Sequence, residues 1–489
     1  MKLKFTKINK KLIISFNFIA ILVLANLLVG FISLPRIDLT KNKIHTLSNS
    51  SRQIIKDLDD IVNITVYMTD NLPPQAQSSI DSLKNILTEI AHNNPSRIIV
   101  TYKNPNMDSD AKQEAVNIGI EPIQFSTMEQ DSFQVSNAFL GLVVSYGQKQ
   151  EVMPVASDVG NLEYFLLSSI KKLTSSSVST IAIGAGHGQV DPAQIQNLGQ
   201  YLSQIYTPSI VDTDQPDWQI PPNSLFILLS PQQDFVSEDI DKIKNHLSSG
   251  NGILVFFDQF QVDTSLTATK VDTPNFSQFL SDHGFSVVDS IIVDESSNIT
   301  NFSTQSSQFV VQYPYWLSIR PENMNSSLPV LTNISSINLN WASPINLSAS
   351  AKYLLKSSQR SFTTTDTNLS PLNKVDFNSQ ALSQSIVAAI NTDDNKIAII
   401  SDADFIKDDY LNNQGSLLFV TNLVDYLNSD EVLLSIRNKS LLNYPLKVVD
   451  STQKQIIRWS NILIIPVMLF VIFFVSKKLQ SNSHKQKND

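Results

Sequence analysis

Residues 224–258 read SLFILLSPQQDFVSEDIDKIKNHLSSGNGILVFFD and decide the fold class of this chain. The runs SLFILLS and GILVFFD at its two ends are short and almost wholly apolar, which is typical of strands buried on both faces. Between them, SEDIDKIKNHLSSG predicts a helix that ends in a glycine turn. A strand, a helix and a second strand predict two parallel strands joined by a helical crossover.

The same alternation continues on both sides of this stretch. It predicts an α/β fold with a parallel, doubly wound sheet, similar to Rossmann or GATase-like domains. The further elements that we expect in this sheet are a strand at 180–184, a helix at 195–205, a strand at 208–212, a helix at 379–390, a strand at 396–402 and a helix at 417–427.

Two α/β units follow from this pattern. Residues 35–150 alternate strands and helices in an order that is loosely thioredoxin-like. A linking helix occupies 151–176, and the doubly wound unit spans 177–450. Within the second unit, 298–372 is rich in Ser, Asn and Thr, and we expect an insertion or lid of β and loop character there. The elements expected in the first unit are strands at 62–67, 97–102, 133–141 and 142–146 and helices at 80–90 and 111–117.

Two apolar stretches lie outside these units. Residues 12–34 and about 456–476 each have the length and composition of a transmembrane helix. The tails beyond them, 1–11 and 477–489, are basic, so the positive-inside rule predicts that both termini are cytoplasmic. We therefore expect a bacterial inner-membrane protein whose bulk is periplasmic. A cleaved signal peptide is the alternative for the first stretch, and a buried core helix for the second.

Composition excludes several classes of function. The 489 residues include no cysteine, which excludes disulfides, thiolate metal sites and cysteine nucleophiles. The net charge is −9 although both tails are basic, so the body is acidic and nucleic-acid binding is not expected. No G-x-x-x-x-G-K-[ST] motif occurs, so the chain supplies no P-loop ATPase. The sequence predicts no cofactor and no metal cluster.

Several segments, in order, resemble one family. They are DLTKNKIHTLS (38–48), ITVYMTDNLPP (64–74), LEYFLLSSIKKL (162–173), FLSDHGFSVVDSIIVD (279–294) and KIAIISDADF (396–405). Together they are similar to the GldG-like auxiliary component of ABC-2-type, gliding-motility-associated transport systems. The resemblance implies a non-ATPase subunit that works at the inner membrane with an ABC-2 permease and a separate cytoplasmic ATPase. Where the family has a Gly-His-Gly-Glu turn, this chain has Gln189 in the fourth place.

Two groups of residues are candidates for ligand binding. Gly186, His187 and Gly188 follow a predicted strand and precede a predicted helix, as a phosphate-binding turn would, but the spacing is G-x-G-x-G. Asp402 and Asp404 end another predicted strand, where two carboxylates can bind a cation or act as an acid/base pair. A tight structural turn and helix capping are the alternative explanations.

The sequence predicts no catalytic constellation, and we expect a coupling or substrate-recognition subunit rather than an enzyme. One alternative is a carbohydrate- or envelope-binding module independent of a transporter. Another is an enzyme with a site at a His187/Asp402 sheet edge. Tyr313, Tyr315 and Trp316 form an aromatic run that suits either sugar or peptide contact or simple packing.

Overall fold

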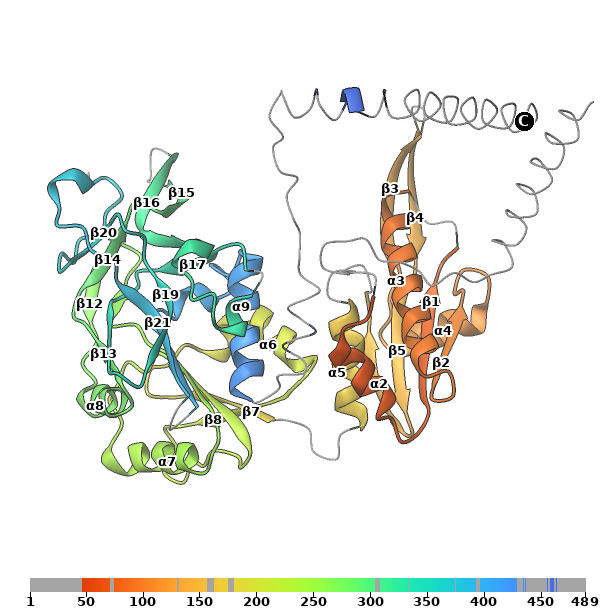
Figure 1. Ribbon diagram of the computed structural model, residues 1–489, viewed down its shortest axis with the longest axis horizontal. Coiled ribbons are helices and arrows are strands. Elements are labelled where there is room, and N and C mark those ends of the chain that lie inside the picture. Colours follow the sequence, from red (N-terminus) through yellow and green to blue (C-terminus); the bar gives the residue numbers. More distant parts are fainter. Residues whose placement is uncertain are drawn as a thin grey trace, which may run out of the picture. The chain divides into compact units, whose positions relative to one another are not determined.

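A computed structural model describes residues 46–428 and a few positions beyond them (Figure 1). The positions left out within that range are 71–73, 130–131, 156–161, 175–179, 304–307, 333, 374 and 393–395, and those described beyond it are 434, 436, 455, 458–460 and 463. No helix in this described part is both long enough and apolar enough to cross a bilayer. The span predicted at 12–34 lies outside the described residues, as does nearly all of 456–476.

A seven-stranded sheet forms the centre of the larger unit. Five neighbouring strands of it are parallel, and two antiparallel strands extend one edge. The strand order is β19 (Lys352–Lys356), β21 (Ile386–Asn391), β22 (Ile397–Ile400), β10 (Ile253–Phe256), β9 (Ser224–Leu229), β7 (Thr180–Ala185) and β8 (Thr207–Asp212).

Helices cover both faces of this sheet because its central strands are apolar at every position. All six residues of β9 are buried, and successive side chains enter different hydrophobic cores. One core contains the apolar side chains of α6 and α9, and the other contains those of α7 and α8. The helices are α6 (Gln196–Ser203), α7 (Ser237–Ser248), α8 (Pro274–Asp282) and α9 (Gln414–Leu427). The predicted α/β fold class is confirmed.

One predicted element of this sheet is wrong. The segment 379–390 was expected to be a helix, but its second half is the strand β21, between β19 and β22. The run Ile386–Asn391 begins with two β-branched residues, and five of its six side chains are buried. A short apolar segment of this kind matches a helix and a buried strand equally well by periodicity, and tertiary pairing decides between them.

The Ser/Asn-rich range 298–372 is built mainly of short strands. Three of them form a separate sheet in the order β15 (Ser297–Ser303), β16 (Gln308–Ile319) and β17 (Ile337–Asn340). Two-stranded pairs surround it: β11 (Phe260–Val262) with β12 (Ala268–Lys270), β13 (Phe285–Val287) with β18 (Ile345–Leu347), and β14 (Ile291–Asp294) with β20 (Ser361–Thr364). That this range is an inserted lid stays a prediction.

A four-stranded mixed sheet lies within 62–153, in the first and smaller of the two units expected from the sequence, and that division of the chain into units stays a prediction. In β1 the odd and even side chains enter opposite faces, since Ile64 and Val66 belong to one core and Tyr67 to another. The sequence did not predict the strands β3 and β6. The strands are β2 (Ile98–Lys103), β1 (Val62–Met68), β5 (Leu140–Tyr146) and β6 (Lys149–Met153) in sheet order, with a hairpin of β3 (Ile123–Glu129) and β4 (Ser132–Ala138). The helices are α2 (Asn49–Lys56), α3 (Pro74–Asn93), α4 (Ser109–Asn117) and α5 (Leu162–Thr174).

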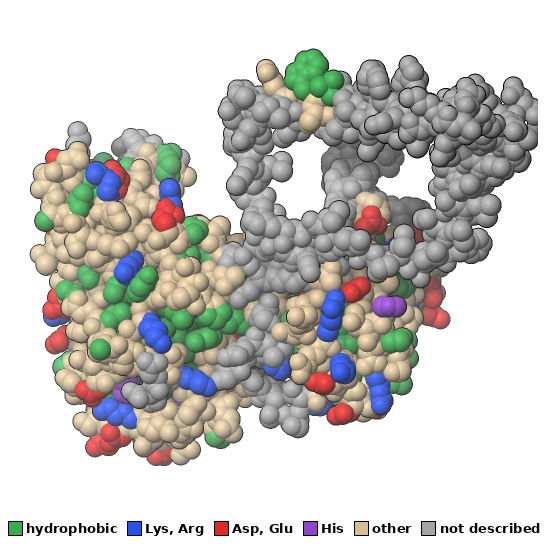
Figure 2. Space-filling model, in the orientation of Figure 1, with side chains coloured by type: hydrophobic (Ala, Val, Ile, Leu, Met, Phe, Trp, Pro, Cys, Tyr) green, Lys and Arg blue, Asp and Glu red, His purple; other side chains and the backbone are tan. Residues whose placement is uncertain are grey.

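Charged side chains are dispersed over the surface of the larger unit. On the face that Figure 2 shows, acidic and basic side chains are scattered singly among uncharged polar atoms. A charged surface patch is therefore not a useful guide to function on this face, and pockets are a better one.

Candidate functional site

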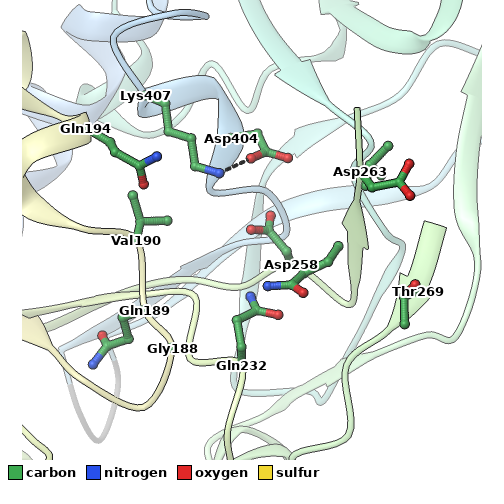
Figure 3. A pocket seen from close by; sticks show the side chains of 12 residues that line it. Gly188, Gln189, Val190, Gln194, Gln232, Asp258, Asp263, Thr269, Asp404 and Lys407 are labelled. Atoms are coloured by element: carbon green, nitrogen blue, oxygen red, sulfur yellow. Dashed lines mark hydrogen bonds and ion pairs between the residues drawn. The ribbon is translucent and has the colours of Figure 1, made fainter. Parts of the chain in front are cut away.

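A pocket of about 290 Å³ lies at the carboxyl edge of the parallel strands (Figure 3). From β7 the chain passes through α6 to β8 on one side, and then returns to β9 on the other side. Ligands of open α/β sheets bind where the strand order reverses in this way. The residues that line the pocket are Gly188, Gln189, Val190, Gln194, Gln232, Asp258, Gln261, Val262, Asp263, Thr269, Asp404 and Lys407.

Three carboxylates meet beside this pocket. Asp258 comes two residues after β10, and Asp402 comes two residues after β22. The two strands pair in register, with Phe256 opposite Ile400, so the two aspartates lie side by side. Together with Asp404, their carboxylate oxygens lie within 4.8 Å of one another.

The oxygens of Asp402 are occupied by backbone donors. One accepts the N–H groups of Asp404 at 2.7 Å and Phe405 at 3.3 Å, and the other accepts the N–H of Asn340. Asp402 therefore caps the turn that follows β22, which is the structural alternative considered for it above.

Asp258 and Asp404 face the pocket more directly. Asp258 accepts the N–H of Ala403 at 2.6 Å, and Asp404 forms an ion pair with Lys407. Figure 3 shows the Asp258 carboxylate directed towards this pair, with the Gln232 amide on its other side. The carboxamide oxygen of Gln232 is buried and has no hydrogen-bond partner among the described residues.

Burial shapes the proton affinity of these carboxyl groups. Loss of hydration, with the nearby Asp404 carboxylate, raises the pKa of Asp258 to about 7. Burial first, and then the carboxylates of Asp258 and Asp404, raise the pKa of Asp402 well above its ordinary value. The cluster therefore retains a proton close to neutral pH. The residues best placed to hold a divalent cation are Asp258, Asp404 and Gln232, but the Lys407 ammonium already neutralises Asp404.

The turn formed by Gly186, His187 and Gly188 has a structural role in the backbone. Gly186, His187 and Gly188 all have positive φ, at 96°, 49° and 66°. A Cβ on Gly186 would lie 2.7 Å from Cγ of Asp214, whose carboxylate accepts the N–H of His187 at 2.8 Å. The turn is therefore sterically restricted to glycine at its first position.

The His187 ring contacts residues outside the cluster of Asp258, Asp402 and Asp404, including the Asp214 carboxylate at 3.3 Å from Nδ1. It stacks on Phe235 with ring centroids 4.2 Å apart, and Nδ1 lies 3.0 Å from the Thr213 hydroxyl. Of the five predicted site residues, Gly188 and Asp404 line the pocket, and Asp402 lies in the carboxylate cluster. Gly186 and the His187 ring are not part of the pocket lining. That any of the five binds a ligand stays a prediction.

The comparison with known families concerns the same region. Residues 178–429, which contain the whole seven-stranded sheet and the pocket, match the model of a family described as an ABC-type uncharacterized transport system. The chain belongs to this family. Membership makes it an auxiliary protein of an ABC-type transport system, a family of generally non-enzymatic components. Residues 41–145 match a domain of unknown function, DUF7088.

Two individual proteins are similar to this chain. An uncharacterized protein of Borreliella burgdorferi (strain ATCC 35210 / DSM 4680 / CIP 102532 / B31) is 22% identical over 485 residues, covering 91% of this chain and 94% of its own. The N-terminal domain of mmIFT52 is 15% identical, with a TM-score of 0.36 over 51% of this chain and 97% of its own. The narrower likeness to GldG-like proteins stays a prediction.

Gln189, where the GldG-like pattern has an acid, has a structural role in this member of the family. Its side-chain oxygen accepts the N–H of Leu229 at 2.9 Å and so ties the turn after β7 to the end of β9. A Cβ on Gly184 would lie 2.9 Å from the same oxygen. A carboxylate could accept this N–H equally well, so the departure does not remove the contact.

The sequence missed the other pocket residues. Asp258 ends the predicted strand GILVFFD just as Asp402 ends KIAIISD, so the same positional signal would have found it. Gln232 and Lys407 lie in loops after β9 and β22 and gave no such signal.

Proposed function

We propose that this chain is a non-ATPase coupling or substrate-recognition subunit of an ABC-2-type transport system. The observation that carries the proposal is the family match over 178–429, which includes the sheet, its carboxyl-edge pocket and the carboxylate cluster. The absence of a P-loop motif from the sequence means that ATP hydrolysis has to come from another subunit. The partners in this proposal are an ABC-2 permease and a separate cytoplasmic ATPase.

The membrane topology is part of the same proposal. Residues 12–34 and about 456–476 would anchor the chain in the bacterial inner membrane, with the α/β units on the periplasmic side. In that arrangement the units meet cargo or an envelope partner outside the cytoplasm, and the anchors dock on the permease.

We also propose a thioredoxin-like fold for the smaller unit and a Rossmann/GATase-like fold for the larger one. The support for the first is the order β2-β1-β5-β6, in which a parallel pair is extended by an antiparallel hairpin. The chain has no cysteine, so a thioredoxin-like unit here serves binding and not thiol chemistry. The support for the second is the parallel sheet with helices on both faces.

An enzyme with a site at the His187/Asp402 edge has less support. The His187 ring is stacked on Phe235, and both oxygens of Asp402 accept backbone N–H groups. Neither side chain is presented to the pocket in the geometry that general acid/base catalysis needs.

The test is purification of the full-length protein from membranes in mild detergent, with mass spectrometry of its companions. The proposal predicts near-stoichiometric recovery of a polytopic permease and a P-loop ATPase. An unrelated inner-membrane protein with the same tag is the control. Recovery of the folded chain alone, under conditions in which other membrane complexes stay intact, would contradict the proposal.

A further inference from the structure

A second pocket, of about 250 Å³, lies on one face of the β15-β16-β17 sheet. At the end of β16 and along β17, alternate side chains enter the main core: these are Leu317, Ile319, Ile337 and Leu339. Alternation along a strand places the residues between them on the opposite face. Trp316 of β16 lies directly opposite Asn340 of β17 in the register, so the two side chains are neighbours on that outer face.

Asparagine amides dominate this pocket. Asn338 and Asn340 occupy alternate positions of β17, although asparagine is depleted in strands. Asn298 of β15 and Asn412, in the loop after η6 (Asp404–Ile406), also line it. Four of the nine residues that line the pocket therefore carry a side-chain amide.

One polar atom of this wall has no hydrogen-bond partner. The indole Nε1 of Trp316 is buried and makes no hydrogen bond within the described part of the chain. Buried polar groups are normally hydrogen-bonded, so this atom points to a ligand that supplies a partner. Asn340, opposite Trp316, is 6% exposed, and its backbone N–H is bonded to Asp402.

Two aromatic rings complete the wall. Trp316 and Tyr410 pack edge to face, with ring centroids 5.6 Å apart and planes at 82°. Tyr410 also packs on Trp341 at 5.8 Å, so both rings are held in place. Tyr313 and Tyr315 of the same aromatic run are buried in the core beneath, and therefore serve packing.

The charge of the lining narrows the class of ligand. Asp409 is the one charged side chain among the nine residues that line the pocket, and no basic residue is among them. An anionic ligand would be repelled, whereas hydroxyl groups can donate to the carboxylate and both donate to and accept from amides. The C–H faces of a pyranose ring are apolar and pack on aromatic rings.

We propose that this pocket binds one neutral hexose unit of a glycan. Its hydroxyls bond to the amides of Asn338 and Asn340 and to the Asp409 carboxylate, and its C–H face lies against Trp316 and Tyr410. The site is separate from the carboxyl-edge pocket. This proposal therefore does not depend on any permease or ATPase partner, and it can be tested separately.

The experiment is isothermal titration calorimetry of the full-length protein in a detergent without a sugar headgroup. The probes are maltotriose, cellotriose, mannotriose and chitotriose, each titrated separately. Choline chloride is a further probe, because a quaternary ammonium also suits aromatic rings beside a carboxylate. We expect saturable binding of at least one trisaccharide and none of choline.

Variants then assign the binding to this pocket. Asn340→Ala and Asn338→Ala should each weaken the trisaccharide by about tenfold, the effect of losing hydrogen bonds to a neutral amide. Asn346→Ala, an exposed asparagine of β18 outside the pocket, is the matched control and should bind as the parent does. Asn338 is only half-buried, so its variant remains informative if Asn340→Ala fails to fold. Binding of choline instead, no saturable binding of any trisaccharide, or affinity unchanged in both folded variants would overturn the proposal.

Discussion

Asp258 shows how the position of a single residue sets its chemistry. Its side chain follows a buried parallel strand, and it shares its surroundings with two other carboxylates. Burial raises its pKa to about 7, against 3.8 for an ordinary aspartate. Between about pH 4 and pH 7 the folded protein therefore holds a proton on Asp258 that the unfolded chain has already released, and the contribution of this group to stability falls as the pH rises through that window.

Asp258→Asn should remove this penalty, because a carboxamide stays neutral and its oxygen can still accept the N–H of Ala403. We expect the free energy of unfolding at pH 8 to rise by about 4 kcal/mol relative to the parent, and to change little at pH 4. Urea denaturation at both pH values measures this. Asp241→Asn, an exposed site on α7, should show no such pH-dependent gain. An Asp258→Asn variant that gains no more stability over the parent at pH 8 than at pH 4 would refute the argument.

Gly186→Ala tests the glycine turn. The substitution adds a Cβ at 2.7 Å from Asp214 and requires alanine to adopt φ of 96°, so we expect a loss of about 1–3 kcal/mol. Gly199→Ala is the control within α6, where a new Cβ meets nothing within 4 Å. That change should stabilise by about 0.5–1 kcal/mol. Thermal unfolding of the two variants should therefore shift in opposite directions, and a shift in the same direction would contradict this account of the turn.

At the scale of elements, the parallel strands were predictable because each is a short apolar run between turn signals. The predictions for β7, β9, β10 and β22 are confirmed, and so are the intervening helices α6 and α7. β21 was not predictable because its apolar residues also match a helix, and only its pairing between two strands decides the matter. β3 and β6 are each one strand of a hairpin. Both mix polar and apolar residues without a regular alternation, so their sequences did not predict strands.

The candidate site was predictable only where it coincides with strand ends. Asp402 and Asp404 were found in this way, and Asp258 could have been. The contacts of the His187 ring were not predictable, because a sequence does not reveal that Phe235 and Thr213, from other loops, hold it. The outer face of β17, which carries Asn338 and Asn340, could be recognised only from the register of the β15-β16-β17 sheet.

Phe256→Ala tests whether the central strand supports the carboxylate cluster. Phe256 ends β10, is fully buried, and packs on Phe405 with ring centroids 5.9 Å apart. Its removal should cost about 3–5 kcal/mol, measured by urea denaturation. Ile210→Ala, at a 61% exposed position of the edge strand β8, should change stability by less than about 0.5 kcal/mol. Similar costs at both positions would contradict this assignment of the core.

At the scale of the whole molecule, the proposed function depends on a membrane topology that places both α/β units in the periplasm. The absence of cysteine makes the topology easy to test, because any introduced cysteine is unique. Ser249→Cys, at an exposed position after α7, should react with a membrane-impermeant maleimide in cells whose outer membrane has been permeabilised. Ser483→Cys, in the basic C-terminal tail, should react only after the inner membrane is lysed. The reverse pattern would refute the periplasmic placement.

We propose that this chain works with a separate ATPase and does not itself hydrolyse ATP. The test is ATP hydrolysis by the natively purified protein, measured before and after its companions are removed in harsher detergent. We expect hydrolysis to co-elute with the chain in the native preparation and to disappear from the stripped, still folded chain. Hydrolysis by the isolated chain, or no hydrolysis in a native preparation of intact complexes, would refute the proposal.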